Sequence, residues 1–140
     1  MSATPRIGPR SLVLFDVVVE IGTGIGLVVA PALVIRLLLG TAARGDAVAV
    51  ARVAGFALIA LCVACWPSRD QPQPGPASIL GLLIYNVLVA LYLGYLGAFR
   101  HVEALALWPA VALHAAVVLL LLSTWRKAPW RSTVTPTTRS

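Results

Sequence analysis

The chain has 140 residues, of which 59% are hydrophobic and 11% charged, and its formal net charge is +6. Soluble domains carry about a quarter charged residues, so this composition excludes an ordinary soluble domain and indicates a membrane protein. The basic residues stand in tails and loops beside apolar runs, without the interleaved aromatic residues of a base-stacking surface. Lipid headgroups therefore explain the positive charge better than nucleic acid does.

Apolar runs long enough to cross about 30 Å of hydrocarbon as helices of about 20 residues divide the chain. They predict spans over residues 12–30, 47–66, 79–97 and 104–125, with tails over 1–11 and 126–140. Because only short connections remain between the spans, we expect a single integral membrane domain covering residues 1–140. The predicted fold class is all-α, a bundle of four transmembrane helices.

The first span follows two arginines, as a signal peptide would, but it is longer than a typical apolar signal core and contains Asp16 and Glu20. No A-x-A cleavage pattern closes it cleanly, so we expect it to be retained. Pro31 is expected to end or kink this span, because proline lacks a backbone donor and crowds the preceding turn. The following PALVIRLLLG predicts a short interfacial helix or a continuation bent along the outer surface.

The run GTGIG in the first span places Gly22 and Gly26 four residues apart, a pattern typical of close helix packing in membranes. It is not a dinucleotide fingerprint, because its glycine spacing differs and no strand precedes it. The third span offers Ala90 and Gly94 in line with Asn86. We therefore expect the first span to pack against the third or the fourth at this face.

Each predicted span carries at least one strongly polar side chain. These are Asp16 and Glu20 in the first span, Arg52 in the second, Asn86 in the third and His114 in the fourth. At about 1.5 Å of rise per residue, Glu20, Asn86 and His114 share one layer near mid-depth. An ionised group there costs about 2.5 to 3.5 kcal/mol, so it should find a partner inside the bundle. Arg52 is the expected partner of Glu20, whereas Asp16 should lie near the inner boundary, within reach of headgroups.

Three interpretations of Glu20, Arg52, Asn86 and His114 stay open. They form a hydrogen-bonded plug that holds the helices in register, or a proton-accepting or ligand-binding site, or a set that a partner protein completes. A transmembrane haem would need a second axial ligand at the depth of His114, and the only other histidine, His101, lies in the outer hairpin. We therefore expect neither haem nor a metal ion.

Cys62 and Cys65 form a C-x-x-C at the end of the second span, a spacing that supports disulfide exchange in soluble proteins. The motif resembles in outline that of the quinone-linked disulfide generators of the DsbB type, which are four-helix membrane proteins. Those enzymes relay electrons through a second cysteine pair, whereas this chain has 2 cysteines in all. Two such side chains three residues apart also pack as small apolar groups.

Basic residues and tryptophans predict the orientation of the bundle. The side that holds both termini carries Arg6, Arg10, Arg69, Arg126, Lys127, Arg131 and Arg139, and the other side carries Arg36, Arg44 and Arg100. The larger group favours cytoplasmic termini, N-in and C-in. Trp66, Trp125 and Trp130 then mark the inner interface, and Trp108 marks the outer one.

The length, the four-span layout and the basic inner tail resemble those of the DoxX-like group of small bacterial membrane proteins. The segment PALVIRLLLG and the R-x-x-G from Arg52 to Gly55 look like patterns seen in that group. The resemblance carries no catalytic residue over. Some members are linked to quinone-dependent sulfur oxidation, so the resemblance makes a quinone a candidate ligand.

These observations favour a non-enzymatic accessory or interaction subunit in a bacterial inner membrane, as a homo-oligomer or within a larger membrane complex, with no resident cofactor. The first alternative is binding or transport of a quinone-like or proton-coupled solute at Glu20, Arg52, Asn86 and His114. The second alternative is thiol redox chemistry at Cys62 and Cys65.

Overall fold

The computed structural model describes residues 8–67 and 73–127, which form five α-helices. They are α1 (Pro9–Val29), α2 (Pro31–Leu39), α3 (Asp46–Ala64), α4 (Pro76–Phe99) and α5 (Leu107–Lys127). Four of them, all except α2, are long and apolar enough to cross a membrane. The all-α fold with four candidate spans and a short helix after the first is therefore confirmed. The tail residues 1–7 and 128–140 lie outside the described residues.

Proline and glycine set several of the helix ends. Pro9, Pro31 and Pro76 occupy the first turns of α1, α2 and α4, where a missing N–H group leaves no hydrogen bond unmade. Pro31 ends α1 as expected and begins a separate helix. Gly40 ends α2 with a left-handed φ of 70°, and its N–H donates to the carbonyl of Arg36 at 2.9 Å.

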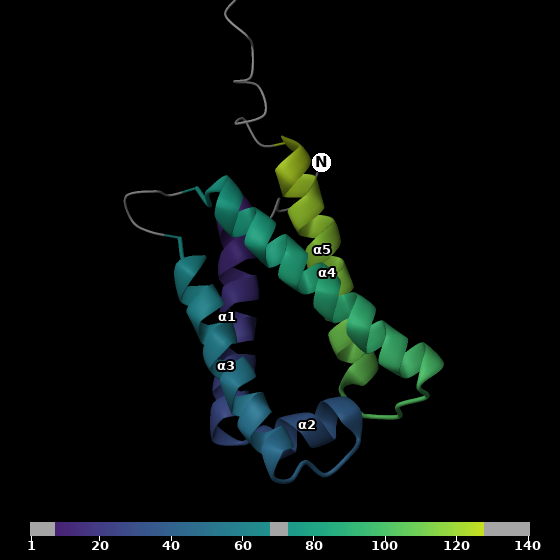
Figure 1. Ribbon diagram of the computed structural model, residues 1–140. Coiled ribbons are helices and arrows are strands. Elements are labelled where there is room, and N and C mark those ends of the chain that lie inside the picture. Colours follow the sequence, from purple (N-terminus) through teal and green to yellow (C-terminus); the bar gives the residue numbers. More distant parts are fainter. Residues whose placement is uncertain (1–7, 68–72, 128–140) are drawn as a thin grey trace, which may run out of the picture.

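The long helices form two closely packed antiparallel pairs, α1 with α3 and α4 with α5 (Figure 1). The two pairs converge at the end that holds the start of α1 and the end of α5, and they spread apart toward α2 (Figure 1). The bundle therefore has one tight end and one open end.

The buried apolar core lies at the tight end. It is built from Leu12, Val13, Val17, Leu58, Cys62, Cys65, Ile79, Leu82, Val117 and Leu121. These residues come from the first half of α1 and α4 and from the second half of α3 and α5, with Cys65 just after α3. The core therefore fills only about half the length of the bundle.

The short helix α2 closes the open end. The N–H of Ala106 donates to the carbonyl of Leu37 at 2.9 Å, and a Cβ on Gly40 would lie 2.7 Å from the carbonyl oxygen of Glu103. These contacts attach α2 to the loop between α4 and α5. The fourth span was predicted to begin at residue 104. Its first predicted turn is instead part of this loop, so α5 begins at Leu107.

The helices α1 and α3 touch at Gly24 and Gly55. A Cβ on Gly55 would lie 2.7 Å from the carbonyl oxygen of Gly24, and a Cβ on Gly24 would lie 3.1 Å from that of Gly55. Gly22 has no such neighbour within 4 Å, and Gly26 faces Val34 of α2. Small residues do bring two spans together, and the first span packs most closely against the second, with a smaller contact to the fourth.

On α4, the stripe predicted to pack against the first span faces mainly α5. A Cβ on Gly94 would lie 4.0 Å from Val111 of α5, and outside the stripe, one on Gly97 would lie 2.8 Å from the ring of Trp108 of α5. Ala90 is half-buried. Of the stripe, Asn86 alone bonds to α1, through its side chain.

Candidate functional site

Five polar side chains meet where the packed core ends. They are Asp16 and Glu20 from α1, Tyr85 and Asn86 from α4, and His114 from α5. Asp16 and Glu20 are each 2% exposed, Asn86 is 0% exposed and His114 is 8% exposed. The predicted layer of Glu20, Asn86 and His114 is thus one cluster, which also contains Asp16 and Tyr85.

Asn86 joins the three helices of this cluster. Its Nδ2 donates to the carbonyl of Leu82 at 2.9 Å and to Oδ2 of Asp16 at 3.1 Å. Both partners are acceptors, so Oδ1 is the amide atom that lies 2.7 Å from Nδ1 of His114. Because an amide oxygen only accepts, His114 donates from Nδ1, and in the neutral form of the ring Nε2 is then an acceptor. Among the described residues Nε2 has no partner.

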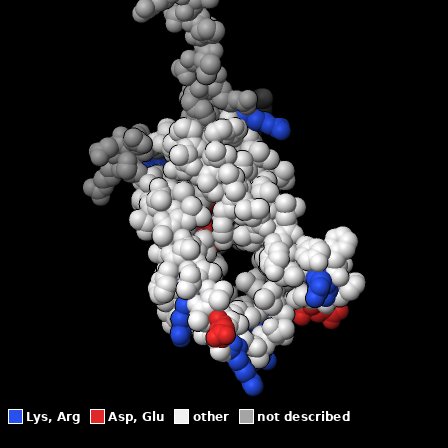
Figure 2. Space-filling model, in the orientation of Figure 1, with Lys and Arg blue, Asp and Glu red and all other residues white. Residues whose placement is uncertain are grey.

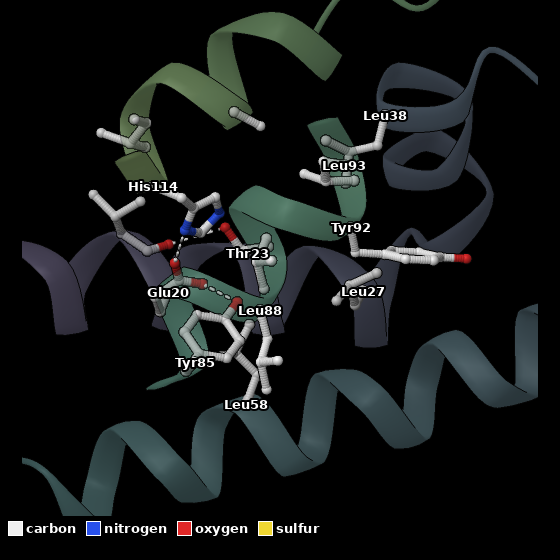
Figure 3. Close-up of a pocket in the computed structure, with 14 residues that line it drawn as sticks. Glu20, Thr23, Leu27, Leu38, Leu58, Tyr85, Leu88, Tyr92, Leu93 and His114 are labelled. Atoms are coloured by element: carbon white, nitrogen blue, oxygen red, sulfur yellow. Dashed lines mark hydrogen bonds and ion pairs between the residues drawn. The ribbon is translucent and has the colours of Figure 1, made fainter. Parts of the chain in front are cut away.

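Glu20 lies between Tyr85 and His114 (Figure 3). The hydroxyl of Tyr85 donates to Oε2 of Glu20 at 2.8 Å. The other carboxylate oxygen, Oε1, lies 3.5 Å from Nδ1 of His114, and the rings of Tyr85 and His114 meet edge to face. Within the described part of the chain, no Lys or Arg lies at ion-pair distance from Glu20 or Asp16. Both acids are therefore held by hydrogen bonds and not by fixed positive charge.

Arg52 does not join the cluster. Its Nε donates to the carbonyl of Val28 at 3.3 Å, at an exposed position. Val28 belongs to the last turn of α1, whose carbonyls lack partners within the helix and attract a cation. The sequence predicted Arg52 as the partner of Glu20, but in the structure Glu20 contacts Tyr85 and His114 instead. Asp16 also differs from expectation, because it is buried against Asn86 and does not reach the boundary.

A cavity of about 480 Å³ opens on the side of the cluster away from the core. Its walls come from all the helices and are formed by Val19, Glu20, Thr23, Leu27, Leu38, Leu58, Tyr85, Leu88, Val89, Tyr92, Leu93, Ala110, Leu113 and His114. Figure 2 shows the molecule hollowed between its two helix pairs. Glu20, Tyr85 and His114 lie at one end of the cavity, and Leu38 of α2 lies at the other (Figure 3).

A second hollow, of about 310 Å³, adjoins the first. The two share Leu27, Leu58 and Tyr85, and the second extends along α3 to Ala54, Ala57 and Leu61. Helices α3 and α4 are not closely packed against each other. On the α4 side, Leu88 and Tyr92 are 61% and 63% exposed although both line the cavity. The cavity therefore has a side opening between α3 and α4, on a face that apolar lipid would cover.

Cys62 and Cys65 lie in the packed core, on the opposite side of the cluster from the cavity. They are 0% and 5% exposed and both are free thiols. The Sγ of Cys65 donates to the carbonyl of Ser78 at 3.8 Å. Disulfide exchange needs an accessible thiolate, so this burial favours packing, and redox chemistry stays a prediction. The described residues contain no group of three or more His, Cys, Asp or Glu side chains that could hold a metal ion.

Asp16 was not predicted as a member of the site, and Tyr85 was not predicted as a partner of Glu20. For Asp16 a signal exists, because residues four apart lie on one face of a helix and Glu20 is already in the buried layer. For Tyr85 the sequence gives little signal. A residue next to Asn86 points about 100° away around the helix, so depth alone does not place it beside Glu20.

Comparison with known proteins found no family model, curated protein or solved structure that matches the chain. The resemblance to the DoxX-like group therefore stays a prediction.

Proposed function

We propose that this integral membrane protein binds a lipid-soluble small molecule in the cavity between its two helix pairs. One observation supports the proposal above all: a hollow of about 480 Å³ ends on Glu20, Tyr85 and His114. In a plug, side chains would fill the space beside these groups. A mostly apolar pocket of this size with a few polar groups at one point is typical of ligand sites.

The chemistry of the cavity describes the ligand. Leu27, Leu88 and Leu93 are among the wall residues and favour an apolar body. At the polar end, Nε2 of a neutral His114 is a free hydrogen-bond acceptor, which favours a ligand head that donates a hydrogen bond or carries positive charge. The hydroxyl of Thr23 already donates to the carbonyl of Val19 at 3.1 Å. A molecule dissolved in the bilayer would enter between α3 and α4.

Filling the cavity should weaken ligand binding while the polar cluster stays unchanged. Ala110 lines the cavity one turn before His114, so Ala110→Phe would place a ring in the hollow. We expect the saturable fluorescence increase of 1-aminoanthracene, a neutral aromatic amine, with wild-type protein in lipid nanodiscs. In Ala110→Phe the apparent affinity for 1-aminoanthracene should be at least about tenfold lower, because the added ring occupies the space of the ligand.

Ala112→Phe is the matched control. Ala112 lies on the same helix, is exposed and does not line the cavity. This variant adds the same ring to the lipid-facing side and should bind 1-aminoanthracene as the wild type does. Equal binding by Ala110→Phe and the wild type would show that the probe binds elsewhere and would argue against the proposal.

We also infer that both termini are cytoplasmic. The start of α1 and the end of α5 lie at the same end of the bundle (Figure 1). Arg10, Arg126 and Lys127 belong to that end, and the predicted basic tails would add to them. A bias of Lys and Arg toward one side supports its placement in the cytoplasm.

Reporter fusions expressed in bacterial cells test this orientation. A green fluorescent protein fused after Ser140 should fluoresce, and alkaline phosphatase fused there should be inactive, because the phosphatase folds only after export. Phosphatase inserted after Thr41, in the connection between α2 and α3, should be active. The reverse pattern would contradict the proposed orientation.

The role of accessory or interaction subunit stays a prediction. The outward faces carry exposed apolar side chains such as Val53, Phe56 and Leu119. Lipid covers such a surface as well as a partner protein does, so these residues do not favour one over the other.

A further inference from the structure

We propose that the cavity takes a lipophilic organic cation, which exchanges with a proton on Glu20. Ligands of this class are ammonium or phosphonium ions with an apolar body. The inference rests on the proposed function, because it names the class of ligand for the same cavity.

In the part of the chain that the structure describes, the two buried acids of the cluster have no fixed positive charge beside them. Asp16 and Glu20 are both buried, and in the described chain neither has a Lys or Arg at ion-pair distance. The arginine nearest in depth, Arg52, is bonded to the end of α1. An ionised carboxylate inside a membrane bundle needs a positive partner. Glu20 lines the cavity and Asp16 does not, so Glu20 is the acid that a ligand can reach.

The groups that face Glu20 from every packed helix bring no fixed positive charge. They are Asp16 from α1, Cys62 from α3, Tyr85 from α4 and His114 from α5, while α2 presents Leu38 to the cavity. A charged His114 ring would direct a second N–H, at Nε2, toward mostly apolar walls, which favours the neutral ring. The charge of an ionised Glu20 can therefore be balanced by a proton or by a cation that enters the cavity.

The walls of the cavity suit such a cation. Tyr85 and Tyr92 line it together with leucine and valine side chains, and of the two tyrosines Tyr85 lies beside Glu20 (Figure 3). Aromatic faces attract organic cations through the ring quadrupole, and the aliphatic residues suit the apolar body. The free Nε2 acceptor of His114 adds to the same preference, because its lone pair attracts positive charge.

The exchange balances in atoms and charge. The O–H bond of the Glu20 carboxyl breaks, the proton passes to water, and the cation takes its place beside the carboxylate. One proton should therefore be released for each cation bound, and raising the pH should strengthen binding by up to about tenfold per pH unit. A neutral ligand should show neither effect.

Tetraphenylphosphonium is the probe for this exchange. The full chain is placed in nanodiscs of neutral lipid, binding is followed with the radiolabelled cation, and proton release is followed with a pH indicator in weak buffer. Glu20→Gln should lower the affinity at least about 30-fold, the loss typical of removing one partner of a buried charge pair, and should abolish proton release. It should still bind 1-aminoanthracene, which shows that the variant is folded. Glu103→Gln, a change to an exposed carboxylate outside the cavity, should leave all three readouts unchanged.

The outcomes separate the two proposals. If 1-aminoanthracene binds the wild type but tetraphenylphosphonium does not, or binds without releasing protons, the cation exchange is overturned and the cavity proposal stands. Unchanged binding of the cation by Glu20→Gln also overturns the exchange. If neither probe binds the wild type, the proposed function fails and this inference fails with it.

Discussion

Replacing Asn86 with Leu should lower the free energy of unfolding by about 2 to 4 kcal/mol. Leu has the same branched shape and number of side-chain heavy atoms as Asn but cannot form the bonds to Asp16, Leu82 and His114. A side-chain hydrogen bond inside a membrane protein averages only about 0.6 kcal/mol. The larger expected loss arises because Asp16 stays buried after its donor is removed, and Asn86 is the only described donor to its carboxylate.

Unfolding in a titration of denaturing detergent, followed by circular dichroism, measures this change. The double variant Asp16→Leu, Asn86→Leu is the control, because it removes the buried carboxylate together with its donor. Replacing both partners of a hydrogen bond with apolar groups often costs little, so the double variant should be more stable than Asn86→Leu alone. The single variant Asp16→Leu completes the comparison. If the double variant lost as much stability as Asp16→Leu and Asn86→Leu together, the two residues would not be energetically coupled, and the interpretation of the cluster would be wrong.

The depth of the polar cluster could be predicted from the sequence, because span boundaries and the helical rise fix it within a turn. Glu20, Asn86 and His114 do lie together. The partner of Glu20 could not be predicted in this way. Depth says nothing about rotation around a helix axis or about the register between two neighbouring helices.

The register between α1 and α3 explains why Arg52 is elsewhere. Gly24 meets Gly55, and Val28 meets Arg52, as expected for antiparallel helices that advance in opposite directions. The same register places the level of Glu20 about one turn after Gly55, so Arg52 lies about 10 Å further along the axis. The glycine contact therefore directs Arg52 to the end of α1 instead of to the cluster.

The glycines show a related ambiguity. Gly22 and Gly26 share one face of α1, and Gly24 lies on roughly the opposite face, so the sequence offers two surfaces for close packing. Only the partner helix decides between them. On α3 the residue that decides is Gly55. Because glycine has no side chain, the backbone of α1 can approach it closely at Gly24.

Gly55→Ala should therefore destabilise the bundle, by about 2 to 3 kcal/mol. The added Cβ would lie 2.7 Å from the carbonyl oxygen of Gly24 and 2.9 Å from the Cβ of Leu27. Both are on or next to the backbone of α1, so the helices must move apart and lose packing along their length. The higher helix propensity of Ala, worth up to about 1 kcal/mol, offsets only part of this loss.

Gly22→Ala provides the matched comparison, because it makes the same change on α1 where no side chain or neighbouring helix lies within 4 Å. Its free energy of unfolding should be unchanged or higher by up to about 1 kcal/mol, since only helix propensity is affected. Both variants are compared with the wild type in the same detergent titration. If Gly22→Ala were the more damaging of the two, α1 would pack through its Gly22 and Gly26 face, and the pairing of α1 with α3 through Gly24 and Gly55 would be wrong. The cavity would then lose one of its walls, because Leu58 lines it from the helix that this contact holds in place.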